Sequence, residues 1–154
     1  MSGYQIADEP APSTLARFAV NPLYPMLAAM LAGVWFAWPW FAFNSFAIGS
    51  PTRRAELAWL VAGLILPPAI GSALILARGA ELLPASAGPY IGLAVIVAKL
   101  VVVYAVFLLQ SRTIEIYEYY GGKLVNGIWP LLAAFYVGDR LLQGAPVLLQ
   151  LALS

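Results

Sequence analysis

The chain has 154 residues, of which 62% are hydrophobic and only 10% are charged, and its formal net charge at pH 7 is +1. Soluble domains are roughly half apolar and a quarter charged, so this composition indicates an integral membrane protein. The sequence has no Cys and no His, and its basic residues are scattered, so we expect no metal, no cofactor and no nucleic-acid partner.

Residues 1–22 are predicted to form a mobile or interfacial N-terminal tail. The stretch MSGYQIADEPAPSTLARFAV predicts at most a short interfacial helix, at Thr14 to Val20. It does not resemble a secretory signal peptide, because acidic residues come first and the apolar run that follows is long enough to span a membrane. Residues 23–154 predict one all-α domain, a bundle of four transmembrane helices with short connections, since a crossing takes about 20 apolar residues.

Four apolar segments predict these spans, at about residues 25–48, 57–77, 90–110 and 124–150. Pro67 and Pro68 predict a kink in the second span, either packed against its neighbours or forming a broken helix that lines a cavity. The stretch SRTIEIYEYY predicts that the third helix continues past the membrane as far as Gly121. The fourth segment exceeds a single crossing, so it either tilts strongly or ends near Gly138 before an interfacial segment.

The Lys and Arg residues outside the spans predict the orientation. The loops after the first and third spans carry Arg53, Arg54, Arg112 and Lys123, whereas the tail and the second loop carry Arg17 and Arg78. Because basic loops stay in the cytoplasm, this distribution places both termini outside it.

Three charges near or within the spans are candidates for chemistry. Lys99 lies near the middle of the third span, where a charge costs from ~2.5 to above 10 kcal/mol, so it needs a partner. In an antiparallel hairpin Asp139 would lie roughly 9 Å from it along the axis. The pair either fixes helix register, lines an aqueous cavity for a proton, ion or polar substrate, or contacts a partner's helix. Alternatively, Lys99 snorkels while Asp139 and Arg140 lie among the headgroups.

The stretch VWFAWPWFAFNSF concentrates aromatic residues in the first span. Tryptophan favours membrane interfaces, but these tryptophans fall near the middle of the predicted span, which indicates packing against helices, a partner or a lipid. The candidates for such contacts are Trp35, Trp38, Trp40, Asn44 and Tyr104.

Three motifs, FNSFAIGSP, LLQSRTIEIYEYYGG and NGIWP, carry a resemblance. They are similar to a loosely defined group of small bacterial inner-membrane proteins with four spans. The matching positions are Asn44, Gly49, Pro51, Gln110, Gly121, Gly122 and Trp129. The resemblance implies the architecture and a multi-pass inner-membrane location, and it implies no activity.

The sequence has no phosphate-binding loop, no Gly-x-Ser-x-Gly elbow and no histidine to activate a serine, so we expect a protein that is not an enzyme. The favoured hypothesis is an accessory, assembly or immunity-type protein that contacts another membrane protein or a second copy. The alternative is a small transporter or channel-like protein using Lys99 and Asp139. A third is lipid handling by a cavity under the tryptophans.

Overall fold

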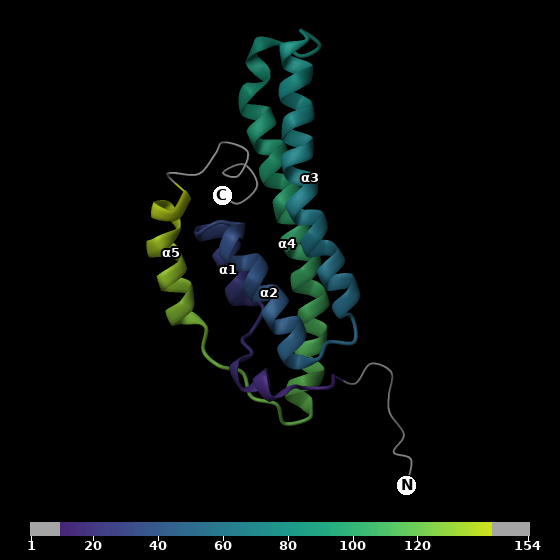
Figure 1. Ribbon diagram of the computed structural model, residues 1–154, viewed down its shortest axis with the longest axis vertical. Helices are drawn as coiled ribbons and strands as arrows, with labels where there is room; N and C mark the ends of the chain where they lie inside the picture. Colours follow the sequence, from purple (N-terminus) through teal and green to yellow (C-terminus); the bar gives the residue numbers. More distant parts are fainter. Residues whose placement is uncertain (1–9, 143–154) are drawn as a thin grey trace.

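The computed structural model describes the backbone of residues 10–142 and side chains as far as Val137, and this part of the chain is all-α (Figure 1). Within it, the only strand-like pairing is an isolated bridge between Val20 and Val125. The elements are η1 (Thr14–Phe18), α1 (Leu23–Leu31), α2 (Val34–Ile48), α3 (Arg53–Gly79), η2 (Ala85–Ala87), α4 (Gly88–Tyr119) and α5 (Ile128–Leu142). The short helix expected at the end of the tail is present as η1.

The region expected to form the first span consists of two helices that fold back on each other. Gly33, between α1 and α2, has φ 90° and ψ 165°, a conformation essentially restricted to glycine. The two helices pack side by side and run in opposite directions, so the start of α1 and the end of α2 both lie on the same side of the Gly33 turn (Figure 1). The prediction of one crossing helix over residues 25–48 is therefore wrong.

The segment before α1 runs along the C-terminal end of α2. The Ser13 N–H donates to the Ala47 carbonyl over 3.0 Å, and the Ala11 N–H donates to the Gly49 carbonyl over 3.2 Å. Gly49 has φ 66°, and a Cβ placed there would lie 1.8 Å from the Ala11 carbonyl oxygen, so this approach requires glycine. The sequence predicted that the tail and the loop after α2 lie on opposite sides of the membrane. For the described part of the tail, that prediction is wrong.

The helices α3 and α4 form a long antiparallel hairpin. They have 27 and 32 residues, which at 1.5 Å per residue corresponds to about 40 and 48 Å. Their turn, residues 80–87, is here called the distal end. The basal end holds residues 10–20, 49–52 and 120–127. The hairpin extends beyond the α1–α2 turn toward the distal end (Figure 1).

Among the described residues, only α3 and the segment containing α4 are long and apolar enough to cross a membrane. The predicted four-span bundle is thus not confirmed. The extension of the third helix is confirmed, since α4 continues to Tyr119. The fourth predicted segment begins later than expected, because Val125 is extended and donates its N–H to the Ala19 carbonyl over 2.8 Å before α5 starts.

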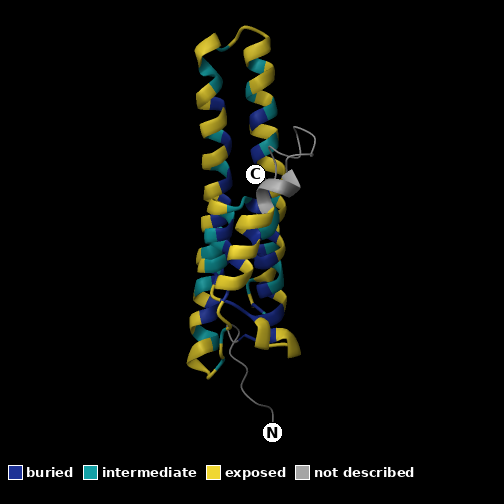
Figure 2. Cartoon of the chain, turned by 90° about the vertical axis from the view of Figure 1, so that its left-hand side faces the viewer, coloured by how far each residue is buried: buried dark blue, intermediate teal, exposed yellow. Residues whose placement is uncertain are grey.

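The core lies where α2 packs against the α3–α4 hairpin. Its buried members are Val34, Ala37, Trp38, Phe41, Leu60, Val102, Val103 and Val106. On the outer faces of α3 and α4, large apolar side chains are exposed along most of the length (Figure 2). Two smaller buried clusters lie nearer the basal end, one around Ile48 and Ile114 and one around Trp40 and Leu131. The described part of the chain therefore buries its apolar residues around α2 and leaves the outer faces of α3 and α4 uncovered.

Candidate functional site

A buried polar cluster surrounds Glu56, which sequence reasoning missed. Glu56 lies in the first turn of α3 and is 0% exposed. The surrounding polar groups come from the end of α2, from the connection to α3 and from α4. They are Ser45, Ser50, Thr52, Gln110 and Thr113. The cluster therefore joins all three helices at the basal end.

The Glu56 carboxylate is satisfied by neutral donors. It accepts hydrogen bonds from the hydroxyls of Ser45 and Ser50. It also accepts from the Thr52 hydroxyl over 2.7 Å and from Gln110 Nε2 over 3.0 Å. No Lys or Arg side chain within the described residues makes an ion pair with it. Hydrogen bonds to a charged group are about twice as strong as neutral ones, so these donors can hold a buried carboxylate.

The Gln110 amide links α4 to α2 as well as to α3. Its Nε2 lies 2.7 Å from the Phe41 carbonyl oxygen and 2.9 Å from Ser45 Oγ. Its Oε1 is buried and has no hydrogen-bond partner among the described residues. An unsatisfied buried oxygen lowers the stability gained from the cluster, so the position of Gln110 is determined by its donor side.

Asn44, a predicted contact residue, holds the segment before α1. Its Oδ1 accepts from the Val20 N–H over 3.2 Å, and its Nδ2 donates to the Val20 carbonyl over 2.9 Å. Asn44 is 0% exposed. One side chain therefore satisfies both backbone groups of Val20, as a neighbouring strand would.

Lys99 faces the interior of the α3–α4 hairpin and is 6% exposed. Two contacts fix the register of α3 against α4: Glu56 lies beside Gln110, and Gly63 lies against Val102. Continuing this antiparallel register places Pro67 of α3 at the same level as Lys99 of α4. This level is about 16 Å from Glu56, at 1.5 Å per residue.

Pro67 and Pro68 lie within α3, which continues through both, so the broken-helix alternative is not observed. Without their N–H groups, the carbonyls of Gly63 and Leu64 lack the usual helical donor. The α1–α2 turn lies at about the same level as Pro67. Ser45 of α2 contacts Glu56 of α3, and the number of residues from Ser45 to Val34 equals the number from Glu56 to Pro67. The Lys99 side chain and the carbonyls without a helical donor are therefore polar groups that lie about halfway along an otherwise apolar hairpin.

The predicted pairing of Lys99 with Asp139 stays a prediction. Asp139 and Arg140 belong to α5, but their side chains lie outside the described residues.

The predicted aromatic contacts have different environments. Trp38 is buried against Gly63, and within the described part of the chain its Nε1 has no hydrogen-bond partner. Trp35 donates from Nε1 to the Ala32 carbonyl over 2.7 Å, beside the α1–α2 turn. Tyr104 is 56% exposed on α4. Trp38 and Trp35 are therefore packing residues, whereas Tyr104 faces outward.

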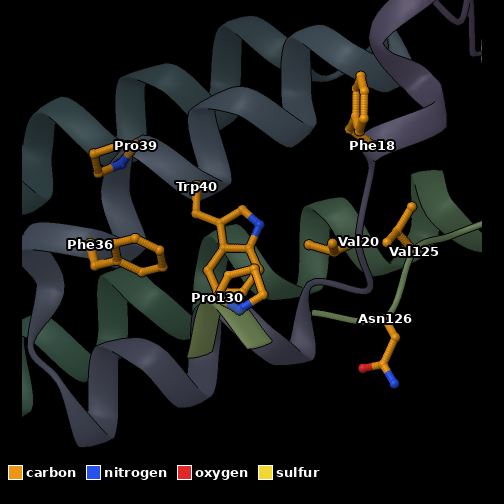
Figure 3. Close-up of a pocket in the computed structure, with 8 residues that line it drawn as sticks. All are labelled: Phe18, Val20, Phe36, Pro39, Trp40, Val125, Asn126 and Pro130. Atoms are coloured by element: carbon orange, nitrogen blue, oxygen red, sulfur yellow. The ribbon is translucent and has the colours of Figure 1, made fainter. Parts of the chain in front are cut away.

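Trp40 forms the wall of an open apolar groove of about 410 Å³ (Figure 3). Its ring stacks on Tyr24 with centroids 6.5 Å apart and meets Phe36 edge to face at 5.2 Å. The groove lies between α2, the segment around η1 and the start of α5. It is lined by Phe18, Val20, Phe36, Pro39, Trp40, Val125, Asn126 and Pro130.

Comparisons with protein-family models, curated proteins and solved structures find no match to this chain. One sequence feature could have indicated Glu56. Three hydroxyl residues, Ser45, Ser50 and Thr52, precede this acidic residue, which lies in the first turn of a helix.

Proposed function

We propose that the protein is integral to a membrane, with α3 and α4 as its crossing hairpin. The support is the separation of polar levels along an apolar pair of helices. Glu56 and Gln110 lie at the basal end, and Arg78 and Gly88 lie at the distal end. The two levels are about 33 Å apart at 1.5 Å per residue, close to the roughly 30 Å hydrocarbon thickness of a bilayer.

In this placement α1 and α2 form a re-entrant hairpin. Irregular backbone at membrane depth is tolerated where other groups of the protein satisfy it. At this turn Ala32 and Gly33 are half-buried, the Ala32 carbonyl accepts from Trp35 Nε1, and Val34 packs in the core. The hairpin enters from the basal side, turns at Gly33 about halfway through, and returns. The bacterial inner membrane, to which the motif resemblance points, is the proposed location.

The basal end is the proposed cytoplasmic end. Five basic side chains lie there among the described residues, and one lies at the distal end; the five are Arg17, Arg53, Arg54, Arg112 and Lys123, and the one is Arg78. The four-span interpretation placed four basic residues on one side of the membrane and two on the other. The re-entrant hairpin brings Arg17 to the same end as the other four, so the asymmetry is larger here. The segment before α1 is accordingly cytoplasmic.

Within the membrane, we infer a non-catalytic assembly role. The observation that carries it is the distal half of the α3–α4 hairpin, which extends beyond the α1–α2 turn and exposes large apolar side chains on both helices. Ile75 and Leu76 on α3 are 51% and 72% exposed, and Ile96 on α4 is 54% exposed. Small residues are exposed on the same half of the hairpin, Ala69 and Ala73 on α3 and Gly92 on α4, and they let a helix of a partner or of a second copy pack closely there.

Site-specific photo-crosslinking in the native membrane tests this role. A photoreactive residue replaces Leu76 or Ile96, and a matched position, Val61, is 54% exposed on the basal half of α3. The expected result is a discrete protein adduct from the distal positions and none from Val61. Twice the monomer mass identifies a second copy, and another mass identifies a partner. Adducts with lipid alone at all three positions would contradict an assembly role.

A second candidate function, a small transporter or channel, is favoured by one observation. Lys99, the Pro67–Pro68 pair and the α1–α2 turn lie at one depth near the bilayer centre, and transporters often place broken helices and charged groups there. Proton or ion flux in reconstituted vesicles tests it with Lys99→Met. Flux equal to that of protein-free vesicles, or flux unchanged by Lys99→Met, would remove this candidate.

A further inference from the structure

The groove at Trp40 has the chemistry of a hydrocarbon site. Its volume of about 410 Å³ lies within the roughly 300–1,000 Å³ of small-molecule sites. Among the described residues that line it, the only side-chain amide is that of Asn126. Asn126 Oδ1 already accepts from the Tyr24 hydroxyl at 2.9 Å and the Ile128 N–H at 3.0 Å. The lining therefore favours an apolar ligand over a polar one.

A cation stands at the rim of this groove. The Arg17 guanidinium lies 4.8 Å above the ring of Phe18, and Phe18 lines the groove. Arg17 is exposed and makes no ion pair within the described part of the chain. Arginine binds phosphate with two parallel hydrogen bonds, so the rim is suited to an anionic headgroup.

The depth of the groove matches a lipid. Trp40 lies five residues from Ser45 along α2, which is about 7 Å toward the bilayer centre from the level of Glu56. Phe36 lies one turn deeper, and Arg17 lies in η1 at the basal end. The order from the basal end inward is thus cation, aromatic wall and deeper apolar wall.

We propose that this groove binds one acyl chain of an anionic phospholipid from the basal leaflet, with Arg17 on the headgroup phosphate. The inference rests on the proposed membrane placement. Figure 3 shows the aromatic side chains of α2 facing Val20 and the segment before α5 across the groove. Because Trp40 is held by Tyr24 and Phe36, the wall is formed before the lipid arrives.

Native mass spectrometry of the detergent-purified full chain tests the proposal. The probes are phosphatidylglycerol and phosphatidylcholine with identical acyl chains, titrated separately. The wild-type chain should retain one phosphatidylglycerol with an affinity about tenfold above that for phosphatidylcholine, as expected for one charge-assisted contact. Arg17→Gln should abolish this preference, and Val125→Trp should fill the groove and weaken binding of both lipids at least tenfold.

Matched controls separate the groove from general effects. Arg54→Gln removes a basic charge from the same end, and Val61→Trp adds an indole to an exposed apolar position outside the groove. Both should bind like the wild type, and circular dichroism should show that Val125→Trp is folded. Equal binding of both lipids by the wild type, or undiminished binding by folded Val125→Trp, would overturn the proposal.

Two further measurements distinguish a bound lipid from a bound protein and test membrane insertion by itself. Disulfide formation between two copies of the Val125→Cys variant in membranes would show that a protein occupies the groove, which also overturns the proposal. Carbonate extraction reports membrane insertion independently of lipid binding. If the protein stays in the membrane but Val125→Trp binds lipid normally, the proposed lipid site is wrong and the proposed membrane placement is retained. If the protein is extracted as a soluble species, both fail.

Discussion

Gln110 of α4 donates a hydrogen bond from Nε2 to the fully buried carboxylate of Glu56 on α3 over 3.0 Å. The same nitrogen lies 2.7 Å from the Phe41 carbonyl oxygen of α2. One amide and one carboxylate therefore determine how the α1–α2 hairpin meets the long hairpin. Because the Glu56 donors are all neutral, the cluster stabilises the basal end without an ion pair from the described residues.

Replacing Glu56 by alanine is expected to destabilise the protein by about 3 kcal/mol or more, because several buried donors lose their acceptor. Glu56→Gln should cost less, since its carbonyl oxygen still accepts and the hydroxyls can turn. The measurement is unfolding in mixed detergent micelles followed by circular dichroism. Glu115→Ala, an exposed acid on α4, is the control and should change stability by less than about 0.5 kcal/mol. Equal stability of Glu56→Ala and this control would contradict the role of the cluster.

Replacing Asn44 by alanine should release the segment before α1. Two hydrogen bonds to Val20 are lost, and both backbone groups of Val20 remain buried. Hydrogen exchange of residues 11–20, measured by mass spectrometry, should become faster by about tenfold, the effect of roughly 1.4 kcal/mol. Thr14→Ala in the same segment is the control, since the Thr14 side chain makes no hydrogen bond to another described residue. Unchanged exchange in Asn44→Ala would mean that other contacts hold the segment.

The all-helical class and the apolar character of α3 and α4 could be predicted from the sequence, because hydropathy over about 20 residues reports them directly. The re-entrant hairpin could not. Residues 25–48 have the length and composition of a crossing, and one continuous helix would leave fewer backbone groups without an intrahelical partner than two short helices do, so composition and hydrogen bonding both favour a single helix. Only Gly33 differs locally, and its spacing from Ala29 and Ala37, four residues on either side, also indicates close helix packing.

The buried polar residues of the candidate site could likewise be predicted only in part. Asn44 and Gln110 were marked by motif resemblance, and their buried amides have defined partners. Glu56 was missed because an acid beside Arg53 and Arg54 at a helix start is typical of a solvated helix end. Its burial depends on Gln110, which is 54 residues away in the chain. Contacts at that separation are set by the packing of hairpins, and no local pattern reports it.

Replacing Gly33 by alanine should destabilise the protein by about 1–3 kcal/mol, because φ 90° with ψ 165° is strained for any residue with a Cβ. Gly92→Ala on α4 is the matched control. A Cβ there meets nothing within 4 Å, so helix propensity alone should stabilise it by about 0.5–1 kcal/mol. Thermal unfolding in detergent compares the two variants. A Gly33→Ala variant as stable as the wild type would indicate one continuous helix through residues 32–33.

The topology distinguishes a re-entrant hairpin from a crossing helix, and the absence of native cysteine makes it measurable without background. The variants are Ala11→Cys, Lys123→Cys and Glu81→Cys, labelled with a membrane-impermeant maleimide. In intact cells only Glu81→Cys should react, and the other two should react after the membrane is opened, because basic basal residues favour the cytoplasm. If residues 25–48 crossed the membrane, Ala11→Cys would react together with Glu81→Cys. That outcome would exclude the re-entrant hairpin, since the Ala11–Gly49 hydrogen bond cannot form across a bilayer.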